Sequence, residues 1–246
     1  MNQLDAIKVV EKSRNEFVSQ VDQAAEAAII EVIRDHYPEH AILAEESGAT
    51  GDHEYQWIID PLDGTTNYAH GLPIFCASLS LEIEGRAEVG AIFDPTRQEL
   101  FTAERGEGAY LNGARLKVSS TTALLDSLLV TGFPYDVHKQ TGDLVPLFGA
   151  FLGKARAVRR LGSAALDLCY VAAGRFDGFW EQHLKPWDVS AGALIVAEAD
   201  GQVTGMDGSP FDPVAAHLVA SNRRIHTQML DLITGFRRER ARNRTV

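Results

Sequence analysis

The chain has 246 residues, of which 45% are hydrophobic and 23% charged, enough for one large domain or two small domains that share an interface. Its 23 Lys and Arg residues against 34 Asp and Glu residues give a formal net charge of −11, which argues against non-specific binding to nucleic acid or to an anionic membrane. No apolar run approaches the ~20 residues of a membrane span, and the start of the chain does not resemble a signal peptide. Cys76 and Cys169 both have apolar neighbours in the sequence, so we expect them to be reduced core residues of a cytoplasmic protein.

The first part of the chain predicts two helices and a short strand. Apolar spacing indicates helices over residues 4–12 and 22–36. A buried strand is expected at residues 41–44, and the polar residues 48–56 are expected to form a loop. The residues expected on the buried face of the second helix are Ala25, Ile29, Val32 and Ile33.

The densest group of polar residues follows the apolar run at 57–59, with the sequence Asp-Pro-Leu-Asp-Gly-Thr-Thr-Asn at 60–67. The run predicts the end of a buried strand that delivers two carboxylates to a sheet edge, with a stiff turn at the proline. The glycine lets the backbone approach a ligand, and the two threonines that follow could open a helix. The amides of Gly64, Thr65 and Thr66 would then lie at a helix N-terminus, where anions bind. Carboxylates for a hard cation beside amides for an anion indicate a metal-assisted phosphate site. The alternative is a solvated acidic turn that caps a helix.

The rest of the chain divides into two patterns at a Ser- and Thr-rich joint, residues 119–122, which predicts halves of residues 1–120 and 121–246. Before the joint, alternation predicts an antiparallel meander of strands at 75–83, 87–93, 99–104 and 114–118. After it, strands are expected at 127–131, 177–181 and 217–220, and helices at 145–152, 162–173, 187–199 and 225–236. The charged tail, 237–244, is expected to be frayed and solvated.

Three motifs together resemble the inositol monophosphatase family: Glu-Glu-Ser at 45–47, the eight residues at 60–67, and Trp-Asp-Val-Ser-Ala-Gly at 187–192. The resemblance runs from about residue 12 to residue 224. It implies an α/β fold, a layered αβαβα sandwich of the inositol monophosphatase and fructose-1,6-bisphosphatase type. The N-terminal half would be α+β, the C-terminal half α/β, and the site would lie between them. Family chains usually carry one more helix before Lys12, so N-terminal packing and dimer contacts are where this chain is expected to differ.

The resemblance also implies a cofactor, Mg²⁺, with two or three ions per site. One ion would be held by Glu45, Asp60 and the carbonyl of Leu62. A second would be held by Asp60, Asp63 and Asp188, with Glu45 near a weaker third. The catalytic residues it implies are Glu45, Asp63 and Thr65, since Glu45 and the Thr65 hydroxyl would orient the attacking water.

The resemblance further implies contacts with substrate and residues that support them. The substrate-binding residues it implies are Leu62, Asp63, Gly64, Thr65, Thr66, Gly162, Ser163, Ala164, Glu181 and Asp188. The supporting residues it implies are Lys12, Asp22 and Glu46, the last because neighbouring residues on an extended segment point opposite ways. Close helix packing is the alternative for residues 162–165, and a solvated strand end is the alternative for Glu181.

The function implied is a Mg²⁺-dependent, Li⁺-sensitive phosphomonoesterase that hydrolyses myo-inositol monophosphate, acting as a homodimer. Histidinol phosphate, fructose bisphosphate and adenosine 3′,5′-bisphosphate are alternative substrates, and a carboxylate at Glu181 disfavours the bisphosphates because it repels a second phosphate. A regulatory protein that associates with RNA polymerase is the alternative from another class. The negative net charge argues against direct RNA binding but leaves a protein partner open.

Overall fold

The computed structural model describes residues 9–13, 16–134, 137–138, 142–215 and 217–243, with only the backbone for residues 9–13 and 16–19. Its helices are α1 (Gln20–His36), α2 (Thr65–Ala69), α3 (Leu144–Leu152), α4 (Ala164–Ala172), α5 (Pro186–Glu198) and α6 (His226–Asn243). None of these helices combines the length and apolarity that crossing a membrane requires.

The N-terminal half is built on an eight-stranded sheet in the order β10-β9-β8-β7-β6-β5-β3-β4. Neighbouring strands are antiparallel except β3 and β5, which run parallel and so end at the same edge. Glu84 and Asn112 take positive φ in the predicted hairpin turns, each followed by glycine. The strands are β3 (Ala41–Ala44), β4 (Gly48–Thr50), β5 (Tyr55–Asp63), β6 (Cys76–Ile83), β7 (Arg86–Asp94), β8 (Glu99–Glu104), β9 (Gly108–Leu111) and β10 (Ala114–Arg115). A separate hairpin pairs β1 (Val9–Ser13) with β2 (Glu16–Ser19).

The C-terminal half is built on a five-stranded mixed sheet in the order β12-β11-β13-β15-β14. Its strands are β11 (Leu128–Thr131), β12 (Ala157–Arg159), β13 (Gly178–Gln182), β14 (Gln202–Thr204) and β15 (His217–Ser221). β11 pairs in parallel with β12 and β13, and the other pairs are antiparallel.

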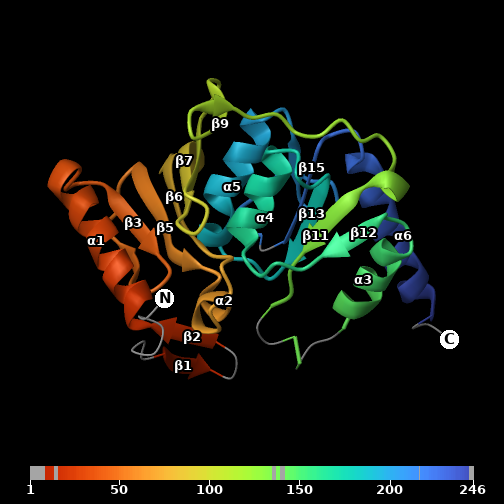
Figure 1. Ribbon diagram of the computed structural model, residues 1–246, viewed down its shortest axis with the longest axis horizontal. Helices are drawn as coiled ribbons and strands as arrows, with labels where there is room; N and C mark the ends of the chain where they lie inside the picture. Colours follow the sequence, from red (N-terminus) through yellow and green to blue (C-terminus); the bar gives the residue numbers. More distant parts are fainter. Residues whose placement is uncertain (1–8, 14–15, 135–136, 139–141, 216, 244–246) are drawn as a thin grey trace.

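The helices complete five layers, as Figure 1 shows. α1 packs on the outer face of the first sheet, α3 and α6 pack on the outer face of the second, and α4 and α5 fill the space between the sheets in one shared core. Gly192 allows α5 to approach α4, since a Cβ there would lie 2.6 Å from Leu168 Cδ1. The predicted αβαβα sandwich is therefore confirmed. The division after residue 120 falls between the two sheets and stays a prediction.

Several element predictions were wrong in detail. Residues 9–13 form a strand rather than the end of a helix, and β4 lies in the expected loop. The short strands β9, β12 and β14 were missed, and α6 continues through Asn243, where a frayed tail was expected. Val32 of α1 is 60% exposed, whereas Asp22 and Glu26 of the same helix are buried.

Candidate functional site

The parallel strands β3 and β5 bring two acidic residues together at one sheet edge. The Glu45 amide, directly after β3, donates to the Ile59 carbonyl at 3.1 Å, which places Glu45 beside Asp60. Asp60 is buried, and its Oδ1 accepts from the Leu62 amide at 2.9 Å. The register of β5 against β6 shifts between Asp60 and Asp63, so a bulge stands where a turn was expected.

Asp63 joins this edge to the central helix layer. Its Oδ2 accepts from the Ser163 hydroxyl and from the Ala165 amide, each at 2.7 Å, at the start of α4. Ser163 also caps α4 by accepting from the Leu166 amide at 3.4 Å. The carboxylate therefore meets the positive end of a helix, which favours its charged form.

Asp188 comes from the other central helix. It lies in the first turn of α5, where its Oδ2 accepts from the Lys185 amide at 2.6 Å in a capping arrangement. Pro186 begins the helix, a position where the missing amide hydrogen costs nothing. The local sequence thus fixes the carboxylate at the helix start, facing the strand edge.

Burial raises the pKa values of the three aspartates, and neighbouring carboxylates raise those of Asp60 and Asp188 further. The pKa of Asp60 lies well above its ordinary value because of burial and, after that, the nearby charges of Glu45, Asp63 and Asp188. Burial raises the pKa of Asp63 to about 6, against the opposing hydrogen bonds from Ser163 and Ala165. Burial and then the charge of Asp63 raise the pKa of Asp188 to about 7. Such a group needs protons or a cation to be stable at neutral pH.

A divalent cation matches the chemistry of this group, whose donors are all hard carboxylate or carbonyl oxygens. In their present positions no three or more His, Cys, Asp or Glu side chains of the described chain are arranged to hold an ion. Asp63 and Asp188 direct Oδ2 to backbone amides, and Asp60 hydrogen-bonds with Glu45. Rotation of these side chains away from their present partners would turn their oxygens toward a shared cation, so the residues fit a cation after side-chain adjustment.

Gly64 and Thr65 form the turn that follows the carboxylates. Gly64 has φ 98°, and a Cβ there would lie 2.8 Å from the Ile74 carbonyl oxygen, so only glycine fits. The buried Thr65 hydroxyl lies 3.2 Å from Asp22 Oδ1 and 3.1 Å from the Leu62 carbonyl oxygen. Thr66 follows, half-buried, in α2.

Two buried acidic residues of α1 support the site from behind. Asp22 contacts the Thr65 hydroxyl, and its supporting role stays a prediction. Glu26 accepts from the amides of Glu46 and Ser47, each at 2.9 Å, and so holds the turn that carries Glu45. Glu26 was missed, because a glutamate on a helix normally indicates a solvated face. The side chain of Lys12 lies outside the described part of the chain.

The expected substrate residues of the second half lie close to these carboxylates. Glu181 on β13 is buried, and its pKa is raised to about 8 by burial and then by the charge of Asp188. Gly162 has φ 89° next to the Arg160 side chain, and Ala164 begins α4. The hydroxyl of Ser163 is bonded to Asp63, which gives it a structural role whatever it does for substrate.

Asp167 is a further acidic residue here that the sequence did not single out. It is buried on α4, and neither carboxylate oxygen has a hydrogen-bond partner within the described residues. Burial and then Glu181 hold its pKa well above the ordinary value, while Arg160 opposes the rise. An aspartate in the first turn of an otherwise apolar helix could have been recognised as unusual.

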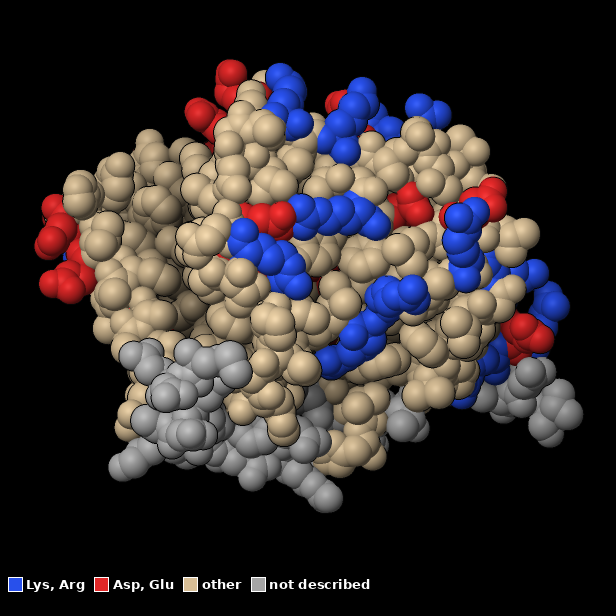
Figure 2. Space-filling model, viewed as in Figure 1, with Lys and Arg blue, Asp and Glu red and all other residues tan. Residues whose placement is uncertain are grey.

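Positive charge is present near the acidic group despite the chain's net charge of −11. Arg159 and Arg160 are exposed, and Arg160 lowers the pKa values of Asp63 and Glu181. Figure 2 shows many Lys and Arg side chains over the half that carries β11, β12 and α3. An anionic ligand would therefore meet favourable charge on that side.

Comparisons with known proteins agree on one family. The model of the "Inositol monophosphatase family" matches residues 2–236. A relative from Pasteurella multocida called "Nus factor SuhB" is 49% identical over 235 residues, covering 93% of this chain and 86% of the relative. The solved structure of an inositol monophosphatase from Anabaena (Nostoc) sp. PCC 7120 is 47% identical with a TM-score of 0.85, covering 87% of this chain and 86% of that one. The extragenic suppressor protein suhB of Bartonella henselae is 39% identical with a TM-score of 0.89, covering 94% and 90%.

Proposed function

Because the chain belongs to the inositol monophosphatase family, we propose that it is a Mg²⁺-dependent phosphomonoesterase that hydrolyses myo-inositol monophosphate to inositol and phosphate. The observation that carries the proposal is the meeting of Glu45, Asp60, Asp63 and Asp188: after burial, the charges of the other three raise the pKa of Asp60, and the charge of Asp63 raises that of Asp188. Two or three Mg²⁺ ions per site, a homodimer and a cytoplasmic location remain predictions.

The residues of the site would take three kinds of part in the reaction: they would hold the metal, position the attacking water and bind the phosphate. When bound, Mg²⁺ activates water as a nucleophile and neutralises charge on the leaving oxygen. Glu45, Asp60, Asp63, Asp188 and the Leu62 carbonyl would hold it. Glu45 accepts a proton from the water that Thr65 orients, and the Gly64 and Thr65 amides bind the phosphate oxygens.

Glu181 would select the substrate by contacting its hydroxyl groups. A buried carboxyl group can bind ring hydroxyls whether or not it is protonated, whereas its ionised form would repel a second phosphate. Histidinol phosphate stays an alternative, since its ammonium could pair with this carboxylate. A phosphate-release assay with Mg²⁺ across these monoesters and bisphosphates tests the choice, and preference for a bisphosphate would refute it.

The catalytic assignment is tested by kcat and KM across a Mg²⁺ titration. We expect Glu45→Gln and Thr65→Ala to lower kcat by ~10²–10⁴-fold with little change in KM. The matched control is Glu46→Gln, which should matter far less. A Glu45 variant with normal kcat, or a Glu46 variant that is worse, would overturn the assignment. Millimolar Li⁺ should inhibit the wild type.

The curated relatives favour a second function, since several that are 45–49% identical carry the name Nus factor SuhB. A role in a transcription complex with RNA polymerase is the corresponding candidate for this chain. Co-purification with RNA polymerase tests this role. The Asp63→Asn variant, which we expect to lack phosphatase activity, is tested in parallel to show whether binding depends on hydrolysis. Equal recovery of both forms would support a role independent of catalysis, and absence of polymerase from both would refute it.

A further inference from the structure

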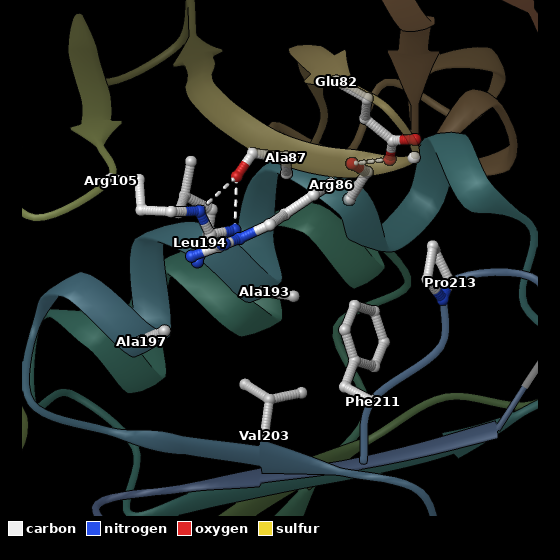
Figure 3. Close-up of a pocket in the computed structure, with 12 residues that line it drawn as sticks. Glu82, Arg86, Ala87, Arg105, Ala193, Leu194, Ala197, Val203, Phe211 and Pro213 are labelled. Carbon is white, nitrogen blue, oxygen red and sulfur yellow. Dashed lines mark hydrogen bonds between the residues drawn. The ribbon is translucent and has the colours of Figure 1, made fainter.

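A cavity of about 260 Å³ lies between the β6–β7 hairpin and α5 (Figure 3). β6 starts at Cys76, opposite Asp63, and reaches the cavity at Glu82, opposite Gln56. Asp60 pairs with Ser78, four strand residues or ~13 Å from Glu82, so the cavity lies beside the candidate active site and is lined by different residues.

The inner end of the cavity is a buried carboxylate with spare hydrogen-bonding capacity. Glu82 is 6% exposed, and its Oε1 accepts from the Ser190 hydroxyl at 2.6 Å. Ser190 in turn accepts from the Ser80 hydroxyl at 2.8 Å. Within the described chain Ser190 is the one side chain that donates to Glu82, so the second oxygen of Glu82 is available to a donor from a ligand.

The outer end carries two guanidinium groups that share one carboxylate. Arg105 Nε donates to Glu88 Oε1 at 3.1 Å and to the Ala87 carbonyl at 2.9 Å. Arg86 Nε lies 3.5 Å from the same Glu88 oxygen, and the Arg86 side chain is 66% exposed. One positive charge is thus in excess, and Arg86 is free to turn toward an anion.

The walls between these ends are apolar. Ala193, Leu194 and Ala197 of α5 lie on one side, and Phe211 and Pro213 lie on the other (Figure 3). Such walls exclude a polyol phosphate or an inorganic anion as the preferred ligand. The volume suits a molecule of roughly a dozen non-hydrogen atoms.

We propose that this cavity binds a small organic carboxylate with an apolar body and a hydroxyl group. The carboxylate pairs with Arg86 and Arg105, the hydroxyl donates to Glu82, and the body packs against α5 and Phe211. The same helix presents Asp188 in its first turn, two residues before Ser190. Occupancy therefore alters cation affinity at the site, a consequence that rests on the proposed function.

Calorimetry with 3-(4-hydroxyphenyl)propanoate tests the binding, which needs no phosphatase activity. We expect the wild type to bind this probe saturably and the Arg86→Ala variant to bind it at least about fivefold more weakly. The wild type should bind 3-phenylpropanoate, which lacks the hydroxyl group, more weakly than the probe. The Ala197→Phe variant should not bind the probe, because the larger side chain fills the cavity. Arg86 and Ala197 are both exposed, so neither change threatens folding. The matched control is Arg156→Ala, another exposed arginine in a single ion pair, with Asp126 at 3.3 Å, which should bind normally.

No saturable binding at millimolar probe, or unchanged binding in Ala197→Phe, would overturn the cavity as a ligand site. A Mg²⁺ titration with and without saturating probe tests the coupling. A shift in Mg²⁺ affinity of about twofold or more, absent in Ala197→Phe, supports it, because linkage between two sites is reciprocal. Unchanged Mg²⁺ affinity at saturating probe refutes the coupling and leaves the binding result standing.

Discussion

Asp167 is a buried carboxyl group that we expect to lower the free energy of unfolding. Both of its oxygens lack a hydrogen-bond partner in the described chain, and burial keeps its pKa well above the ordinary value. A group with a raised pKa contributes stability that is present below its unfolded pKa and is lost as pH rises through the folded value. Buried charge of this kind is typical of functional sites.

We expect Asp167→Asn to increase the free energy of unfolding by ~1–2 kcal/mol at pH 7.5, because it removes the charge and preserves the shape. The gain should shrink toward pH 4, where the carboxyl group is protonated in both states. Thermal unfolding across this pH range measures the effect. Asp231→Asn, at an exposed position of α6, is the control. A destabilised Asn variant at pH 7.5 would show that the carboxylate is compensated.

Ser163 can be assigned either to substrate or to Asp63, and kinetics distinguish the two. Its hydroxyl lies 2.7 Å from Asp63 Oδ2, and this bond lowers the pKa of Asp63 against the effect of burial. We expect Ser163→Ala to reduce kcat about tenfold and to raise the Mg²⁺ requirement, with KM little changed. Ser163→Thr should restore most of the activity. A pure rise in KM would instead assign the hydroxyl to substrate.

At the scale of elements, α1 acts as a support for the site as well as a cover for the sheet. Glu26 spans the amides of Glu46 and Ser47 and so fixes the turn after β3. We expect Glu26→Gln to raise the Mg²⁺ concentration for half-maximal activity about tenfold. The glutamine side chain can accept from only one of the two backbone amides, and its NH₂ group would face the other donor. Glu31→Gln, exposed on the same helix, is the control. Equal Mg²⁺ responses of the two variants would contradict the role given to Glu26.

The same helix shows where sequence patterns fail. Apolar periodicity assigned Val32 to the buried face, yet the helix buries Asp22 and Glu26, because their carboxylates bond to the site loops. Residues 60–67 were found because strand-end carboxylates followed by Gly-Thr form a local signal. Strands of three or four residues, such as β12 and β14, are too short for alternation to register, and their pairing partners lie far away in sequence.

At the scale of the molecule, the candidate site draws on three of the five layers. Asp60 and Asp63 come from the first sheet, Asp188 from the central helices, and Glu181 from the second sheet. Sequence motifs identified these residues one at a time. Their closeness depends on α4 and α5 packing between the sheets, a long-range contact that only the family resemblance implied. Neither Asp167 nor the Glu82 cavity carried a motif, so both required the fold.

His226 makes the stability of the whole molecule sensitive to acid. It is buried at the start of α6, where its ring nitrogens lie 2.9 Å from the hydroxyls of Thr204 and Ser221. Burial lowers its pKa from 6.5 to about 4. Between pH 6.5 and pH 4 the ring is protonated in the unfolded chain but stays neutral in the folded protein. The stabilisation from the neutral ring is therefore fully present above about pH 6.5 and is lost as pH falls toward 4.

We expect His226→Gln to lower the free energy of unfolding by ~1–3 kcal/mol at pH 7.5, through the loss of two buried hydrogen bonds. Between pH 7 and pH 4.5 the variant should lose less stability than the wild type, so the two curves converge. Denaturant unfolding at several pH values measures the difference, and His183→Gln, an exposed histidine, should follow the wild type. Parallel curves for His226→Gln and wild type would mean that His226 has the same pKa in the folded and the unfolded chain, because the pH dependence of stability reports only a difference in bound protons between the two states.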